Sequence, residues 1–202
     1  MTEAGIGRIL VASLHQGIAD VLPTRLEFYE NWLNQDGLRH GTIGLAPLNA
    51  VLSFLRQEGE PYRQITRRAG EYAAEWSVAS QGPLRRSLIR SLPLWWRSRV
   101  VLRLARRTIR STYVGSRAIL RLRKGRGTLD VRGSLFCNVR DSSPEHLCGF
   151  YAAAVQRFLE LYSVPVAVRL DRCRAVGDSS CLIAITLDTR RTPSVISVTE
   201  PE

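Results

Sequence analysis

Hydrophobic and polar positions follow two different periods along the chain, and the change falls near Gly115. Before that residue, apolar side chains recur every three or four positions, which is the spacing of one helix face. This spacing predicts helices within residues 1–40, from 47 to 58, from 62 to 76 and from 98 to 113. Glycine and proline interrupt the pattern between these segments, and loops are expected there.

Beyond that point the period shortens to two residues. Ala118, Leu120 and Leu122 alternate with arginines, which is typical of a half-exposed strand. The run 124–127 contains two glycines and predicts a hairpin turn, after which the strand returns through residues 128–139. The second half of the chain is therefore expected to begin with a β-hairpin.

A helix and a second hairpin complete the pattern. Ser143, Pro144 and Glu145 supply a cap, a first-turn proline and an acid near the positive helix end, so a helix is expected from here to about residue 162. Two further strands are expected at 165–173 and 181–187. The predicted fold class is α+β, in which N-terminal helices precede a four-stranded antiparallel β-β-α-β-β unit with the helix on one face.

The length and composition suit one folded unit. A chain of 202 residues with 45% hydrophobic residues is long enough for one well-buried core. We expect residues 1–188 to form a single α+β ligand-binding domain and residues 189–202, rich in Ser, Thr and Pro, to form a flexible tail. No apolar run approaches the ~20 residues that span a bilayer, and no signal peptide is recognised, so a cytoplasmic location is expected.

Charge is distributed unevenly. Residues 85–126 contain 14 basic residues and no acidic one, whereas the rest of the chain contains 15 basic and 18 acidic residues. Within this basic segment, two adjacent tryptophans precede an amphipathic helix with an arginine face. The residues expected to form an anionic-surface site are Trp95, Trp96, Arg99, Arg103, Arg106 and Arg110.

Three interpretations of the basic segment remain open. The first is a solvated face. The second is a peripheral membrane-binding surface, in which Trp and Leu enter the interface and Arg pairs with lipid headgroups. The third is a nucleic-acid site. No helix-turn-helix, zinc-finger or RNA-recognition signature supports nucleic acid. An acidic protein partner or an anionic small ligand is a further alternative.

Four cysteines occur in the second half of the chain. If the turn centred on Gly177 closes the last hairpin, Cys173 and Cys181 face each other across it, and Cys148 lies in the helix that packs on the same sheet. Thiolates are good zinc ligands, and a structural site needs four. The candidates for the fourth ligand are His146, Asp171, Cys137 and water. Buried cysteines also simply pack, so a metal-free core is the competing interpretation.

The segments 147–151, 166–168 and 173–181 together resemble the 4-vinyl-reductase (hydrocarbon-binding) domain family, whose fold is related to that of TRAPP transport-particle subunits. The matching motif is a helix with a cysteine followed by a hairpin that reads Cys, small or apolar residues, Gly-Asp and a second Cys. The resemblance implies zinc at Cys148, Cys173 and Cys181 beside an apolar pocket. Leu170 stands where the family has the glutamate that is the fourth ligand.

The resemblance implies a binding protein for a hydrophobic or tetrapyrrole-like ligand, in pigment metabolism or ligand sensing. A vinyl-group reductase or its accessory subunit, and a TRAPP-like scaffold that forms homodimers, are the alternatives. Zinc is the one cofactor suggested, because no Rossmann glycine pattern or phosphate loop is present. The residues expected to line the ligand pocket, each of which is also a normal core residue, are Trp76, Phe136, Phe150, Tyr151 and Phe158.

Overall fold

A computed structural model describes residues 5–33, 43–123, 125–139 and 142–187. The N-terminal half of the chain is helical and the C-terminal half contains the sheet. The α-helices are α1 (Arg8–Val21), α2 (Leu26–Leu33), α4 (Leu45–Gln57), α5 (Glu60–Ala79), α6 (Pro83–Ser91), α7 (Leu94–Ser111) and α8 (Gly149–Leu161). The 3-10 turns are η1 (Pro23–Arg25), η2 (Leu135–Cys137) and η3 (Arg174–Val176), and the strands are β1 (Arg117–Arg123), β2 (Arg126–Arg132), β3 (Val166–Arg172) and β4 (Cys181–Leu187).

The four strands form one antiparallel sheet in the order β1-β2-β4-β3. Two hairpins therefore lie side by side, and the central contact joins β2 to β4, where Val131 is opposite Cys181. The register of β3 with β4 shifts between Leu170 and Arg172, which is a β-bulge at Asp171. The predicted α+β class and the four-stranded antiparallel sheet are confirmed.

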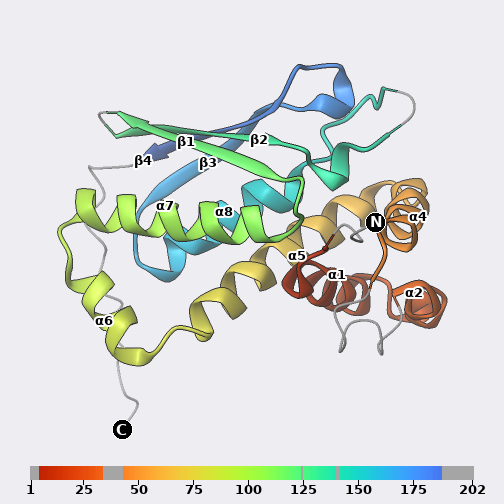
Figure 1. Cartoon of the computed structure of the whole chain (residues 1–202), viewed down its shortest axis with the longest axis horizontal. Coiled ribbons are helices and arrows are strands. Elements are labelled where there is room, and N and C mark those ends of the chain that lie inside the picture. Colours follow the sequence, from red (N-terminus) through yellow and green to blue (C-terminus); the bar gives the residue numbers. More distant parts are fainter. Residues whose placement is uncertain (1–4, 34–42, 124, 140–141, 188–202) are drawn as a thin grey trace, which may run out of the picture.

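Helices cover one face of this sheet. α7 contacts β1 and α8 contacts β3, and α5 lies behind α8 on the side away from the sheet (Figure 1). α5 and α8 approach closely at Gly70, where an added Cβ would lie 2.2 Å from the carbonyl oxygen of Phe150. A glycine is therefore required in the middle of α5, although it lowers the helix propensity by about 1 kcal/mol relative to alanine. α1 packs on the other side of α5.

Several elements differ from the prediction. Helix α6 was not predicted, and α7 begins at Leu94 rather than at residue 98. β2 ends at Arg132 rather than at residue 139, because Gly133 has a φ of 69° and the chain turns into η2. α8 begins at Gly149 rather than at Ser143. The amide of Ser143 donates to the carbonyl of Ala175 at 2.6 Å, so this segment binds to the β3–β4 connection and does not begin a helix. The expected tail, residues 189–202, lies outside the described residues.

The core contains side chains from both halves of the chain. Leu14, Ile18, Ile65 and Phe158 are among the residues with no exposed surface. Among the described residues, no helix combines the length and apolar character needed to cross a bilayer.

Candidate metal centre

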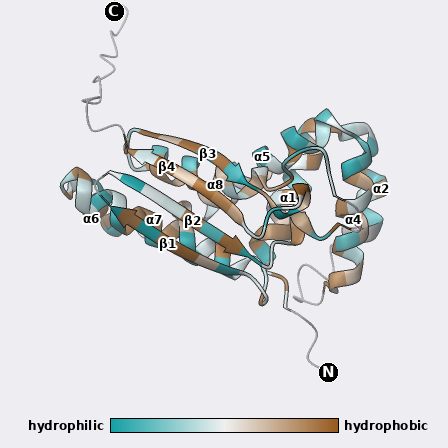
Figure 2. Cartoon of the chain, turned by 90° about the horizontal axis from the view of Figure 1, so that it is seen from above, coloured by the Kyte–Doolittle hydropathy of each residue, from teal (hydrophilic) through white to brown (hydrophobic). Residues whose placement is uncertain are grey.

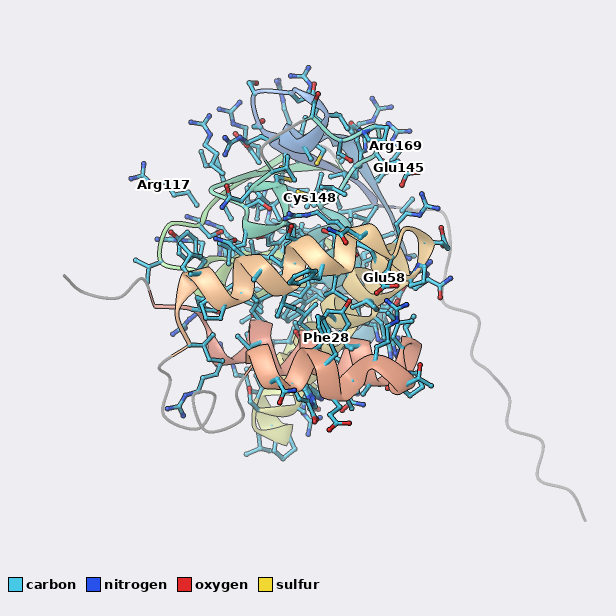
Figure 3. All side chains as sticks on the ribbon, turned by 90° about the vertical axis from the view of Figure 1, so that its right-hand side faces the viewer. Phe28, Glu58, Arg117, Glu145, Cys148 and Arg169 are labelled. Atoms are coloured by element: carbon cyan, nitrogen blue, oxygen red, sulfur yellow. The ribbon has the colours of Figure 1, made fainter. Side chains whose placement is uncertain are left out.

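The four cysteines each lie at the end of a structural element. Cys137 is the last residue of η2, and Cys148 directly precedes α8. Cys173 follows β3, and Cys181 is the first residue of β4. These four elements thus bring their cysteines together at one end of the sheet, near the position where Cys148 is labelled in Figure 3.

All four Sγ atoms lie within 4.8 Å of one another. The Cys137 sulfur is 2.8 Å from that of Cys148, 3.3 Å from that of Cys173 and 3.5 Å from that of Cys181, and the Cys148 and Cys181 sulfurs are 3.0 Å apart. None of these cysteines forms a disulfide, and all four are buried. A tetrahedral ZnS₄ centre with bonds of 2.3 Å has sulfur–sulfur edges of about 3.8 Å, so the thiols need only small movements to surround an ion.

The loop between β3 and β4 holds Cys173 in position. Gly177 adopts the left-handed conformation with a φ of 99°, which closes the loop after η3. The carboxylate of Asp178 accepts a hydrogen bond of 2.8 Å from the amide of Cys173. The backbone on the Cys173 side of the cluster is therefore fixed by the loop itself. On the other side, the hydroxyl of Ser134 lies 3.5 Å from the sulfur of Cys148.

Protons are shared unevenly in this cluster. Hydrogen bonds from neighbouring thiols lower the pKa of Cys173, for which Cys137 is the main partner, and lower the pKa of Cys137, for which Cys148 is the main partner. The same contacts with Cys137 raise the pKa of Cys148 and of Cys181. Contacts between the thiols therefore favour the thiolate form at Cys173 and Cys137 relative to Cys148 and Cys181, and a thiolate is the form of cysteine that binds metal.

The other candidates for the fourth ligand lie elsewhere. The carboxylate of Asp171, at the bulge in β3, accepts a hydrogen bond of 2.7 Å from Arg169. His146 lines a surface groove between α5 and α8. Leu170 packs against the hydrophobic core. Cys137 is therefore the residue that joins the three cysteines of the sequence motif, and it does so because β2 ends early and η2 carries it under the sheet.

Three of the aromatic residues predicted to line a pocket pack on one another. Phe136 stacks on Phe150 with ring centroids 5.0 Å apart, and Tyr151 contacts both rings edge-on. Each of the three is at most 1% exposed. These rings fill the space between η2 and α8, beside the cysteines, and support the cluster from the core.

The other two predicted residues, Trp76 and Phe158, line a surface pocket of about 510 Å³. Its walls come from α1, α5, α7 and α8, and the connection from α5 to α6 closes one side. Ile9 and Leu104 extend the apolar lining. The hydroxyl of Thr108 in the pocket wall lies 3.2 Å from that of Ser77. The sequence pattern did not identify Ile9 or Leu104 as pocket residues, because their spacing is that of ordinary core positions.

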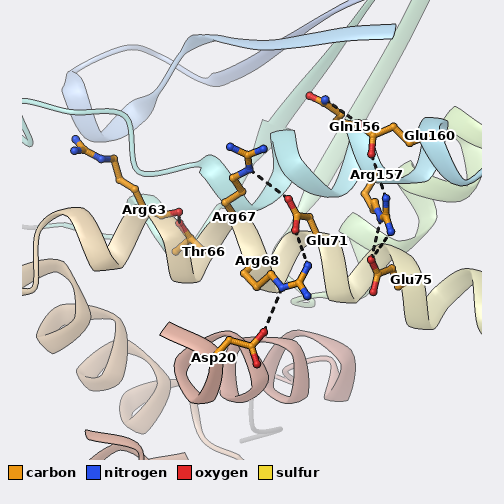
Figure 4. Close-up of polar contacts among 10 residues, drawn as sticks. All are labelled: Asp20, Arg63, Thr66, Arg67, Arg68, Glu71, Glu75, Gln156, Arg157 and Glu160. Carbon is orange, nitrogen blue, oxygen red and sulfur yellow. Dashed lines mark hydrogen bonds and ion pairs between the residues drawn. The ribbon is translucent and has the colours of Figure 1, made fainter. Parts of the chain in front are cut away.

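A second depression, of about 360 Å³, runs between α5 and α8 (Figure 4). Its arginines are already paired with carboxylates. Arg67 bonds Glu71 at 3.3 Å, and Arg157 bonds Glu75 at 2.8 Å. Since these charges are neutralised within the protein, the groove is a salt-bridged helix interface and offers little to an anionic ligand.

The predicted anionic-surface residues lie on α7. Trp95 and Trp96 are 53% and 48% exposed, and their ring centroids are 4.3 Å apart. The guanidinium of Arg99 lies 5.4 Å from the ring centroid of Trp95. Arg103 and Arg110 are exposed, whereas Arg106 is half-buried and donates to the carbonyl of Ala118 in β1 at 2.9 Å. Arg106 thus fastens α7 to the sheet, and the other residues face solvent.

The chain matches no family model and no curated protein sequence. Its fold is similar to that of an H-NOX domain from Shewanella oneidensis in the Fe(II)CO ligation state, with a TM-score of 0.56 and 12% identity over 91% of this chain and 99% of that domain. A crystal structure of an H-NOX protein from the same organism in the Fe(II)NO state gives a TM-score of 0.53 at 12% identity, with the same coverage of both chains. The phenol-responsive sensory domain of the transcription activator PoxR, with phenol, matches 71% of this chain and 74% of that domain at 13% identity, and its TM-score of 0.47 is too low to support an argument.

These comparisons correct the family resemblance inferred from the sequence. The short motif around the cysteines suggested a 4-vinyl-reductase or TRAPP-type protein, whereas the whole fold is similar to H-NOX domains. The motif misled because it covers a small part of the chain and any hairpin with two facing cysteines and a Gly-Asp turn reproduces it. At 12% identity the likeness shows the fold alone.

Neither of the two histidines among the described residues belongs to the group of candidate metal-binding side chains. The Nε2 atom of His15 lies 2.9 Å from a carboxylate oxygen of Glu30 on the neighbouring helix α2, and His146 faces the open α5–α8 groove. The residues suited to a metal ion here are the four thiols.

Proposed function

We propose that this chain is a small-molecule-binding domain whose sheet-and-helix half is stabilised by one zinc ion. The observation that carries the zinc centre is the convergence of Cys137, Cys148, Cys173 and Cys181 in the core, with all sulfurs within 4.8 Å. Tetrahedral sites of four sulfurs hold zinc or iron in proteins. Zinc is the expected ion because it forms four-thiolate structural sites without any redox role.

Such a centre is structural and not catalytic. A catalytic zinc ion keeps one position open for water or substrate, whereas four thiolates close the coordination shell. The ion would link η2, the start of α8 and both sides of the β3–β4 loop. These segments meet at one end of the sheet, where loop hydrogen bonds and the aromatic core also hold them.

Metal content tests this proposal directly. We expect one zinc ion per chain by inductively coupled plasma mass spectrometry after purification without chelators, and a large loss in Cys137→Ser. His146→Ala and Asp171→Asn serve as matched controls, since both were candidate ligands and neither contacts the cluster in the structure. A wild-type protein that contains no metal after growth with added zinc would refute the zinc centre, as would full zinc content in Cys137→Ser. Iron in place of zinc would show a coloured protein and overturn the choice of metal.

The pocket beside Trp76 and Phe158 supports the small-molecule function. Its volume of about 510 Å³ lies within the range of roughly 300–1,000 Å³ that is usual for small-molecule sites. Ile9, Trp76 and Leu104 offer apolar contact, and the hydroxyl of Thr108 offers a hydrogen bond, whereas Phe158 is buried in the wall of the pocket. This lining fits a small hydrophobic or aromatic molecule that carries a hydroxyl or carboxylate group.

A ligand panel tests the pocket. We expect small aromatic alcohols and carboxylates to bind the wild-type protein in saturation-transfer NMR, and Leu104→Trp to abolish binding by filling the pocket. Ile119→Trp is the matched control, because it adds the same side chain at a position of β1 that is 41% exposed. Binding that survives Leu104→Trp would place the ligand elsewhere, and no binding by any member of the panel would count against the function itself.

A further inference from the structure

The helix α6 and the first turn of α7 form an apolar and basic corner at one end of the molecule. Both views place α6 at the end opposite α2 and α4 (Figures 1 and 2). Among the described residues, nine large hydrophobic side chains are exposed, and four of them belong to this corner. The corner is short, since it spans only the 13 residues from 84 to 96. The four side chains are Leu84 at 86%, Leu88 at 67%, Trp95 at 53% and Trp96 at 48% exposure.

The apolar face of α6 is directed away from the core. Leu84 and Leu88 are four residues apart and therefore share one face of the helix. Ile89 is the only residue of α6 that is buried. α6 thus contacts the rest of the protein through a narrow strip and leaves its leucines in water. An exposed apolar cluster of this kind marks an interaction site in a soluble domain.

The charge around this corner has no internal partner. Residues 85–126 contain no acidic side chain, and no ion pair among the described residues involves an arginine of that segment. Arg90 donates to the backbone carbonyl of Leu161, and Arg97 donates to the backbone carbonyl of Arg90. Neither contact neutralises the positive charge of the guanidinium group. A partner that binds this surface would therefore be anionic.

We propose that the corner formed by α6 and the start of α7 docks on an anionic lipid membrane. Leu84, Leu88, Trp95 and Trp96 enter the interfacial layer, and the surrounding arginines pair with lipid headgroups. A nucleic acid would contact only the arginines through its phosphates and would leave the four apolar side chains in water. A membrane accommodates both halves at once, and tryptophan prefers the boundary between headgroups and acyl chains.

Vesicle co-sedimentation of the full chain tests this proposal. The vesicles contain phosphatidylcholine alone or with about 30% phosphatidylglycerol, an anionic lipid. We expect the wild-type protein to bind the mixed vesicles at least about tenfold more strongly than the neutral ones, with weaker binding at high salt. Leu84→Ser/Leu88→Ser should reduce binding to the mixed vesicles by at least about tenfold, because two leucines no longer enter the interface.

Two controls keep this test decisive. Val114→Ser/Ile119→Ser removes two exposed apolar side chains elsewhere and should leave vesicle binding unchanged. Circular dichroism confirms that both double variants fold, as expected from the exposure of the substituted residues. Wild-type protein that ignores the mixed vesicles, or a Leu84→Ser/Leu88→Ser variant that binds them normally, overturns the proposal. Tight binding of duplex DNA that is unaffected by this variant, without vesicle binding, assigns the arginines to nucleic acid instead.

Discussion

The contact between Gly70 of α5 and the first turns of α8 determines where Cys148 lies. A Cβ at position 70 would be 2.2 Å from the carbonyl oxygen of Phe150 and 3.0 Å from the amide nitrogen of Ala154. Both are backbone atoms, so no side-chain rotation relieves the contact. Gly70→Ala therefore pushes α8 away from α5, and Cys148, directly before α8, moves with it.

The size of the effect follows from this geometry. The helices must separate by at least about 0.8 Å for the contact to reach 3.0 Å, in a core that is packed as densely as a molecular crystal. Overpacking of this kind costs about 1–3 kcal/mol, and the upper end applies because the opposing atoms are backbone. Alanine recovers about 1 kcal/mol through its higher helix propensity. We expect a net loss of about 2 kcal/mol, which lowers the Tm by about 4–8 °C in a chain of this length.

Thermal unfolding followed by circular dichroism measures this loss, and zinc content measures the displacement of Cys148. Gly149→Ala is the matched control in the same interface, because its Cβ would lie 3.4 Å from the hydroxyl of Thr66, an ordinary contact. The control should keep the wild-type Tm to within about 2 °C. A Gly70→Ala protein as stable as the wild type would refute the close approach of α5 and α8 and, with it, the argument for the position of Cys148.

Three further measurements follow from the same structure. Chelation of the metal should lower the free energy of unfolding by about 4 kcal/mol if free zinc is about a thousandfold above its Kd, and added zinc should restore it. Tyr62→Phe removes a buried hydrogen bond of 3.2 Å to the carbonyl of Leu147 and should cost about 1–3 kcal/mol in urea unfolding. A hydrogen bond from Tyr72 is the main cause of the lowered pKa of Asp20, so Asp20→Asn should destabilise the protein at neutral pH. The difference in unfolding free energy between this variant and the wild type should narrow as the pH falls below 3.8, the usual pKa of this carboxyl group.

Periodicity in the sequence located the elements of this fold well. The alternation of Ala118, Leu120 and Leu122 with arginine predicted β1, and the apolar spacing of residues 47–58 predicted α4 closely. The helix boundary near Ser143 was wrong for a long-range reason. The side chain of Ser143 does accept a hydrogen bond from the amide of Glu145, as a helix cap would, yet its own amide binds the distant Ala175. The local sequence around Ser143 does not reveal this hydrogen bond to Ala175, because the two residues are far apart along the chain.

The candidate site was predicted in part. The symmetry of Cys173 and Cys181 about Gly177 predicted that those two thiols lie close together, and their Sγ atoms do lie within 4.8 Å of each other. Cys137 remained one of four alternatives, since its position depends on where β2 ends and how η2 turns under the sheet. The ligand pocket was harder to predict, because Ile9 of α1 and Leu104 of α7 meet only after the helices have packed.

The proposed ligand pocket and the proposed membrane corner share α6, and this gives the two sites a physical connection. Gly82 and Arg85 line the pocket, whereas Leu84 and Leu88 of the same segment face away from the core. If docking shifts α6, Arg85 in the pocket wall shifts with it, and a ligand held by Arg85 would in turn bias the position of Leu84 and Leu88. Coupling of this kind is reciprocal, so the factor by which anionic vesicles change ligand affinity must equal the factor by which ligand changes vesicle binding. We expect the two factors to differ from one and to agree with each other. Ligand affinity that is identical with and without vesicles would show that α6 transmits nothing between the sites.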